Sequence, residues 1–229
     1  MTALDEAFRV IRDPRAQGVL QRLHQRADRQ NLSLVRRFVP HLPRLLAGRE
    51  LPWRRIEPKL SSLYLALDPE NGALCYLLSR TLRARQIVEF GTSFGVSTIY
   101  LALAVRDNGG GRVIGTEMVP EKAAQARAHV AEAGLEAFVE IREGNALDTL
   151  QGLEQPVDFL LNDGFPRFTL PVLQLVEPHM RPGAIALCGN AALFPADHAD
   201  YLAWVRAPEN GFRSMHLPMK LAGEVSVKS

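Results

Sequence analysis

The stretch Gln86-Ile-Val-Glu-Phe-Gly-Thr-Ser-Phe-Gly-Val-Ser-Thr-Ile-Tyr-Leu-Ala102 decides the fold of this chain. It begins as a short β-branched run, turns through two glycines and continues as an apolar helix. A strand that breaks on glycine into a helix N-terminus presents backbone N–H groups to a ligand in α/β folds. Gly91 permits a close approach of the backbone to a ligand, and Gly95 permits a tight turn. Taken alone, the pattern also fits an ordinary strand–turn–helix corner.

The rest of the chain continues this alternation of strand and helix with short connections, which predicts a doubly wound parallel sheet. Five parallel strands are expected, at 87–90, 113–116, 138–142, 159–162 and 184–188. The helices between them are expected near 96–106, 120–133, 146–153 and 169–178. A helix at 198–205 and two terminal strands at 212–217 and 224–227 follow. The predicted fold class is therefore α/β, with a doubly wound, mostly parallel, seven-stranded sheet.

The N-terminal quarter of the chain is expected to be a helical cap on this sheet. Apolar residues recur at helical spacing over 16–29 and again over 32–46. Pro40 and Pro43 should kink or split the second of these helices. The predicted division is a helical extension at 1–60 and an α/β domain at 61–229.

The composition of the 229 residues is that of an ordinary soluble protein, with 47% apolar and 23% charged residues. The net charge of +2 and the absence of a long one-sign block predict no nucleic-acid partner. Cys75 and Cys188 lack metal-ligand spacing and are expected to be reduced thiols in a cytoplasmic protein. No stretch approaches the roughly 20 apolar residues of a membrane span, so no membrane partner is expected either.

Polar residues follow all five predicted parallel strands, at the edge where ligands of such sheets bind. Glu117 is placed to accept hydrogen bonds from ribose hydroxyls, Met118 to lie against a purine ring, and Asn145 to bond an adenine edge. Each residue alone is equally explained as a helix cap, but five polar strand ends in a row favour a nucleoside-containing cofactor. The strand ends carry Gly91, Thr92, Ser93, Gly95, Glu117, Asn145, Asn162, Asp163, Gly189 and Asn190.

The spacing of the glycines separates two classes of nucleoside cofactor. Dinucleotide-binding folds use GxGxxG after the first strand, whereas Glu89-Phe-Gly-Thr-Ser-Phe-Gly95 has two glycines and a preceding acid. The string from Val88 to Thr98 resembles the first motif of class I S-adenosylmethionine-dependent methyltransferases, especially the small O-methyltransferases related to catechol O-methyltransferase. The resemblance continues through Gly115-Thr-Glu117, Glu143-Gly-Asn-Ala-Leu147 and Arg181-Pro-Gly183, and it covers roughly residues 60–229.

The resemblance implies a Rossmann-like methyltransferase fold, S-adenosylmethionine as cofactor, and transfer of a methyl group to a hydroxyl of a small molecule. It implies that Gly91, Thr92 and Ser97 hold the methionine part of the cofactor, and that Glu117 holds the ribose. Adenine would lie against Met118, Asn145 and Ala146. The predicted cofactor residues are Glu89, Gly91, Thr92, Ser93, Gly95, Ser97, Glu117, Met118, Asn145, Ala146 and Asp163.

The resemblance also implies a divalent metal, held in the family by an Asp after the fourth strand and an Asp-Asn pair after the fifth. Asp163 and Asn190 match the first and last of these ligands, but Gly189 replaces the middle carboxylate. Pro166 replaces the lysine that usually follows the first ligand. One carboxylate and one amide predict weak or absent Mg²⁺ binding at this site.

The loss of that lysine leaves the catalytic residues open. Asp163 and Asn190 are expected to hydrogen-bond to the cofactor and the acceptor, and Arg167 is a candidate for stabilising an oxyanion, although a guanidinium is no base. His198 is the main candidate for the base and His41 the second, and both are equally explained as surface residues. Five aromatic side chains are expected either to line an apolar acceptor pocket or to pack in the core. They are Trp53, Phe94, Phe165, Phe168 and Phe194.

Three functions are compatible with these features. The first is a small-molecule O-methyltransferase with weak or absent metal dependence. The second is a protein that binds S-adenosylmethionine but has lost methyl transfer, or uses the cofactor for another reaction. The third, a nicotinamide-dependent oxidoreductase, is disfavoured by the missing GxGxxG. The acceptor is not identified by the sequence, and the cap helices suggest a homodimer.

Overall fold

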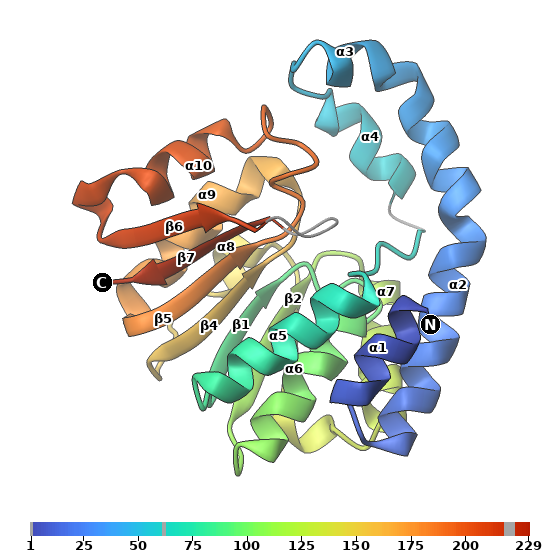
Figure 1. Ribbon diagram of the computed structural model, residues 1–229, viewed down its shortest axis with the longest axis vertical. Helices are drawn as coiled ribbons and strands as arrows, with labels where there is room; N and C mark the ends of the chain where they lie inside the picture. The colour runs from blue at the N-terminus through green and yellow to red at the C-terminus, as the bar shows by residue number, and fades with distance from the viewer. Residues whose placement is uncertain (1, 61–62, 218–222) are drawn as a thin grey trace.

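The computed structural model describes residues 2–60, 63–217 and 223–229. Its centre is a seven-stranded sheet in the order β3-β2-β1-β4-β5-β7-β6 (Figure 1). Strands β1 to β5 are parallel, and β7 runs antiparallel between β5 and β6. The predicted doubly wound, mostly parallel sheet is confirmed. The strands are β1 (Gln86–Phe90), β2 (Arg112–Glu117), β3 (Val139–Glu143), β4 (Val157–Asn162), β5 (Met180–Cys188), β6 (Phe212–His216) and β7 (Glu224–Lys228).

Helices cover both faces of the sheet because successive strand residues point to opposite sides. Ile87 and Phe159 pack with α5, α6 and α7 on one face, whereas Val88 and Leu160 pack with α8, α9 and α10 on the other. No helix among the described residues has the length and apolar character that a bilayer crossing requires. The helices are α1 (Ala3–Val10), α2 (Pro14–Phe38), α3 (Leu42–Leu46), α4 (Trp53–Leu60), α5 (Pro69–Thr81), α6 (Val96–Asp107), α7 (Pro120–Glu132), α8 (Ala146–Thr149), α9 (Pro166–Val176) and α10 (Ala199–Arg206).

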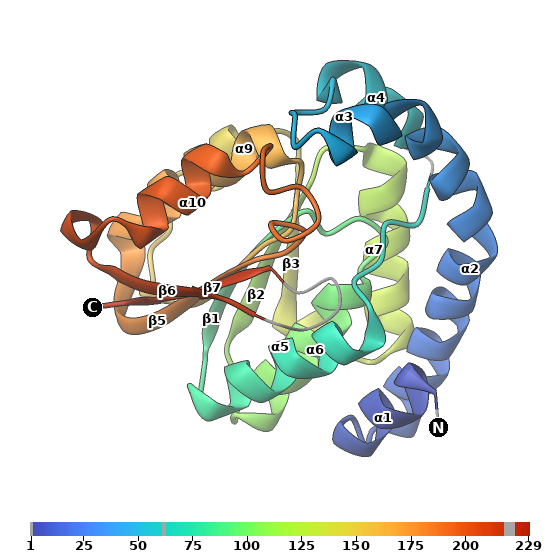
Figure 2. The same ribbon diagram turned by 45° about the horizontal axis from the view of Figure 1, so that its top comes forward.

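The N-terminal segment divides between the core and the cap. Ile11, Val19 and Leu23 are buried in the core that α5 and α6 share, so α1 and the first half of α2 belong to the α/β body. Only the end of α2, with α3 and α4, arches over the carboxyl ends of the strands (Figure 2). The predicted boundary after residue 60 falls beside residues 61 and 62, which lie outside the described residues. The division after residue 60 therefore stays a prediction.

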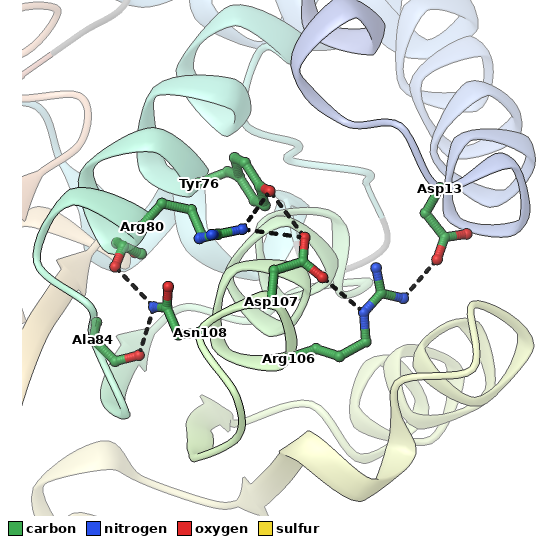
Figure 3. Close-up of polar contacts among 8 residues, drawn as sticks. Asp13, Tyr76, Arg80, Ala84, Arg106, Asp107 and Asn108 are labelled. Carbon is green, nitrogen blue, oxygen red and sulfur yellow. Dashed lines mark hydrogen bonds and ion pairs between the residues drawn. The ribbon is translucent and has the colours of Figure 1, made fainter.

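A polar network holds the N-terminal helices against the body on the side away from the strand ends (Figure 3). Asp107, at the end of α6, accepts a hydrogen bond from the Tyr76 hydroxyl of α5 at 2.9 Å and pairs with Arg106. Arg106 also pairs with Asp13, whose carboxylate caps α2. The Asn108 amide donates to two backbone carbonyls at the end of α5. These contacts fix where α2 begins and hence the direction in which it reaches the cap.

Candidate functional site

Glu89 supports the loop between β1 and α6 from behind. Its side chain is fully buried, and one carboxylate oxygen accepts hydrogen bonds from the hydroxyls of Thr92 at 2.8 Å and Thr98 at 2.6 Å. Burial raises the pKa of Glu89, against the lowering effect of the bonds from Ser97, Thr98 and Thr92. The other oxygen, Oε1, has no hydrogen-bond partner among the residues described. Glu89 therefore stabilises the loop between β1 and α6, and its Oε1 can accept a hydrogen bond from a further donor.

Both glycines of the loop are required by its geometry. Gly91 has φ +97°, and a Cβ atom there would lie 2.9 Å from the carbonyl oxygen of Asp163 and from Cα of Gly164. Gly95 has φ +85° and forms the N-cap of α6. A side chain at either position would be strained by the positive φ. The sequence predicted that a ligand would approach the backbone of Gly91 closely. In the structure the loop after β4 approaches it instead.

Glu117 links the end of β2 to this loop. Its two carboxylate oxygens accept the backbone N–H groups of Ser93 and Val119, each at 2.8 Å. Each oxygen keeps a second lone pair that a ribose hydroxyl can use. Met118 is 55% exposed beside it. Glu117 and Met118 lie at the end of β2, as the sequence predicted, and the N–H groups of Ser93 and Val119 orient the Glu117 carboxylate.

At the end of β3, Asn145 caps α8, since its side-chain oxygen accepts the Leu147 N–H at 3.2 Å. Ala146 begins that helix and is buried. Asn145 is therefore a helix cap, which is one of the two interpretations that the sequence allowed for it. Its predicted contact with adenine stays a prediction.

A narrow cavity lies between the β1–α6 loop and the segment that precedes α5. The Tyr64 ring stacks on the Phe94 ring with centroids 3.7 Å apart, and the Lys122 ammonium lies 5.2 Å from the centre of the same ring. Sequence analysis missed Tyr64 and its neighbours because they carry no motif and no periodicity. The cavity is lined by Tyr64, Leu65, Ala66, Leu67, Gly91, Thr92, Ser93, Phe94, Val96, Ser97 and Asp163.

Asp163 and Asn190 meet at the edge of this cavity. The Asn190 amide nitrogen donates to Oδ1 of Asp163 at 2.8 Å. Burial of the carboxylate, and then the charges of Glu89 and Asp68, raise the pKa of Asp163 to about 7. An ionised Asp163 would therefore be stabilised by a cationic ligand in the cavity.

The arrangement around Asp163 does not fit a Mg²⁺ site. A Cβ atom at Gly189 would overlap Oδ1 of Asp163, so a side chain at this position would require the Asp163 carboxylate to move. No group of three or more His, Cys, Asp or Glu side chains is arranged to hold a metal among the described residues. Mg²⁺ favours carboxylates in an octahedral oxygen shell, whereas Asp163 is bonded to the Asn190 amide.

Arg167 is engaged away from the cavity. Its guanidinium donates to both oxygens of Glu57 on α4, at 2.8 Å and 2.6 Å, and lies 4.3 Å from the centre of the Phe168 ring. It attaches the cap to α9 and does not line the cavity. The predicted oxyanion role of Arg167 has no geometric support in this arrangement.

His198 is buried and not on the surface, which corrects one of the two alternatives for it. Its side chain is 0% exposed, and Nδ1 is 2.9 Å from the carbonyl oxygen of Phe194. Burial lowers the pKa of His198. It does not line the cavity, and its role as the base stays a prediction. His41 lies in the short turn Val39–His41 of the cap.

Aromatic side chains join the cap to the loops after β4 and β5. The Trp53 ring lies 5.1 Å from Phe194 and 6.1 Å from Phe165, and Phe38 stacks on Phe194 at 5.8 Å. The Trp53 indole N–H donates to Asp197 at 2.7 Å. Three of the five aromatic residues predicted for the acceptor pocket thus gather in one cluster. The other two lie apart, since Phe94 stacks on Tyr64 and Phe168 packs against Phe90.

Comparison with known proteins agrees with this geometry. Residues 88–191 match a family described as a methyltransferase domain. The chain is 33% identical over 130 residues to the catechol O-methyltransferase of Niastella koreensis, which covers 55% of this chain and 58% of that protein. It is 32% identical over 145 residues to the catechol O-methyltransferase of Mycobacterium tuberculosis. This match covers 61% of this chain and 65% of that protein. The match thus spans less than two thirds of the length of either relative.

Solved structures extend the likeness to most of the chain. The cofactor-bound protein Rv0187 from MTB has a TM-score of 0.66 at 25% identity and covers 82% of this chain and 89% of its own. An O-methyltransferase from Bacillus cereus in complex with SAH has the same TM-score at 23% identity and shares the fold. The match covers 81% of this chain and 90% of that one. Residues 88–191 are therefore similar in sequence to a methyltransferase domain, and the chain has the Rossmann-like fold of solved methyltransferases.

Proposed function

We propose that this protein transfers the methyl group of S-adenosylmethionine to a hydroxyl of a small molecule. One observation carries the proposal: Ser93 and Asp163 line the cavity beside the Gly91 loop, and Glu117 at the end of β2 accepts the Ser93 N–H at 2.8 Å. The catechol O-methyltransferases among the relatives support hydroxyl transfer. The S-adenosylhomocysteine bound in the Bacillus cereus structure supports the choice of cofactor.

The residues around the cavity fit the charge of this cofactor. S-adenosylmethionine carries a sulfonium and an ammonium cation, and the cavity offers the carboxylate of Asp163 with Glu89 close behind it. Glu89 keeps an unpartnered buried oxygen among the described residues, and Glu117 keeps lone pairs for ribose. The cofactor supplies an activated methyl group. The chain orients it through Glu117 and stabilises its positive end through Asp163.

We infer that the transfer proceeds without a divalent metal. Support comes from the loss of the middle carboxylate at Gly189 and from the hydrogen bond between Asn190 and Asp163. This pair would contact the amino group of the cofactor and the acceptor directly. The aromatic cluster of Trp53, Phe165 and Phe194 favours an apolar or aromatic acceptor. The homodimer, the absence of a nucleic-acid partner and the cytoplasmic location stay predictions.

A second candidate function is cofactor binding without methyl transfer. It is favoured by Pro166 in place of the lysine and by the positions of Arg167 and His198 away from the cavity. The experiment that separates the two is turnover: the protein is incubated with S-adenosylmethionine, EDTA and a panel of phenols and catechols, and S-adenosylhomocysteine is measured. Formation that depends on both acceptor and protein supports transfer. Cofactor binding without any turnover supports the second candidate.

A further inference from the structure

The outer face of the segment from the end of α2 through α3 is apolar and exposed. The inner face of the same segment carries Leu34, Phe38 and Leu45, which pack against α4 and the aromatic cluster. Five aliphatic side chains on the outer face recur at spacings of three and four residues and are between 47% and 83% exposed. Folding has thus covered one face of this segment and left the other bare. These five, here called the outer ridge, are Leu32, Val35, Val39, Leu42 and Leu46.

The outer ridge differs from the other exposed apolar side chains of the molecule. The remaining large ones in the described part of the chain come from separate elements, whereas the ridge places five within 15 residues, from the end of α2 through the turn to α3 (Figure 1). Single exposed apolar residues are normal, but a contiguous patch marks a surface that binds something. The others are Leu77, Met118, Leu193, Met215 and Val227.

The charge beside the ridge is mainly positive. Residues 28–50 contain five arginines and two acidic residues, Asp28 and Glu50, which stand at the two ends of this segment. Arg29 and Arg36 are seven residues apart, two turns along α2, and helical spacing places both along one edge of the ridge. None of the five forms an ion pair within residues 2–60, 63–217 and 223–229. The binding partner therefore has to accept apolar side chains and a net positive charge together.

A second copy of this chain fits that requirement poorly. Symmetric pairing through the ridge would bring together two surfaces that both carry a net positive charge. The 3₁₀ turn Val39–His41 and Pro40 also interrupt the straight helix that a long two-stranded coiled coil needs. An anionic bilayer surface meets both demands, since its headgroups attract arginine while aliphatic side chains enter the acyl boundary.

We propose that the outer ridge docks this protein on the surface of an anionic lipid bilayer. The expectation of no membrane partner rested on the lack of a spanning segment, and surface docking needs none. The docked segment is the back of the cap that covers the carboxyl ends of the strands (Figure 2). The cap side of the molecule would therefore face the bilayer.

The test is co-sedimentation of the full chain with vesicles of phosphatidylcholine and phosphatidylglycerol in a 7:3 ratio, with pure phosphatidylcholine vesicles beside them. Binding is expected to the anionic vesicles and to weaken with added salt. Leu32→Ser with Leu46→Ser removes the two most exposed ridge side chains and should weaken binding at least tenfold. Arg29→Gln with Arg36→Gln should weaken it by roughly fivefold per arginine at low salt. The matched control, Leu77→Ser with Met215→Ser, should bind as the unmodified chain does.

Three results would overturn the proposal. One is no binding to anionic vesicles, and another is equal binding by the ridge variant and its control. The third is a dimer in light scattering that the ridge substitutions convert to a monomer, since the ridge would then be covered by a second copy. Because all variants change exposed side chains, circular dichroism and the melting temperature should show each of them folded.

Discussion

Gly189 packs directly against the carboxylate of Asp163, so closely that a Cβ atom at Gly189 would overlap Oδ1 of Asp163. In the resemblance to metal-dependent O-methyltransferases, this glycine stands where the middle metal ligand is expected. The replacement therefore does more than delete one ligand. It also leaves space for the Asp163 carboxylate, which accepts a hydrogen bond from the Asn190 amide at 2.8 Å.

Gly189→Ala is expected to lower the free energy of unfolding by about 1–3 kcal/mol, because overpacking of a tight contact forces neighbours to shift. Urea denaturation measures it. Gly18→Ala is the matched control: Gly18 lies exposed in α2 with nothing within 4 Å of its would-be Cβ, and this change should stabilise by up to about 1 kcal/mol. Equal effects of the two substitutions would contradict the contact described here.

The elevated pKa of Asp163 predicts a pH-dependent difference in stability. Between 3.8 and about 7 the folded protein keeps a proton on Asp163 that the unfolded chain releases, so this group lowers the free energy of unfolding as pH rises through that window. Asp163→Asn should therefore be more stable than the unmodified chain at pH 8, by roughly 1–4 kcal/mol, with a smaller difference at pH 4.5. Urea denaturation at both pH values measures it, with Asp148→Asn as an exposed control. A pH-independent difference would rule out the assigned ionisation.

The ionisation of Asp163 also predicts how cofactor affinity varies with pH. S-adenosylmethionine should bind more tightly as pH rises through about 7, because an ionised Asp163 attracts its positive end. Asp163→Asn should flatten this dependence. Calorimetric titrations at pH 6 and pH 8 measure it. An equal pH dependence in both proteins would remove Asp163 from the cofactor site.

Glu117→Gln should weaken S-adenosylhomocysteine binding by roughly 10- to 100-fold, since a hydrogen bond to a charged group contributes about 1.5–3 kcal/mol. The glutamine keeps one oxygen for a backbone donor, so the melting temperature is expected to change little. Glu121→Gln, an exposed acid at the start of α7, should bind as the unmodified chain does. Unchanged affinity in the Glu117 variant would mean that ribose lies elsewhere.

Arg167 is expected to attach the cap to α9 through Glu57, and not to stabilise the transition state of methyl transfer. Because Arg167 is 40% and Glu57 12% exposed, a double-mutant cycle of Arg167→Gln and Glu57→Gln should give a coupling energy of about 1 kcal/mol or less. If the protein turns over, Arg167→Gln should raise KM for the acceptor and leave kcat within about twofold, as an attachment residue would. Arg54→Gln on the same cap is the control. A hundredfold fall in kcat would restore the oxyanion role.

The sequence predicted the sheet and its ligand edge because these depend on local patterns. Glycine at a strand end, a β-branched run before it and an acid at the end of the next strand are all contiguous signals, and Gly91, Gly95 and Glu117 stand where they were expected. The structure adds that Gly91 is forced by the loop after β4, a contact between residues over 70 positions apart.

The parts that the sequence did not reveal depend on tertiary packing. Tyr64 lies over the cofactor loop because α2 and α7 hold it, with Gln30 accepting its N–H at 2.9 Å. His198 was expected at the surface or in catalysis, and its burial follows from the fold of the loop after β5. The helix predicted to stop near residue 29 continues to Phe38, since its second half gains the partner α4.

Calorimetric titration of the unmodified chain with S-adenosylmethionine and S-adenosylhomocysteine, first in EDTA and then in Mg²⁺, tests the central claim most directly. The claim is that the cavity beside Gly91, Glu117 and Asp163 binds this cofactor without a metal. Binding of both compounds with the same affinity in EDTA and in Mg²⁺ is the predicted result. No binding under either condition, or binding that appears only with Mg²⁺, would contradict it.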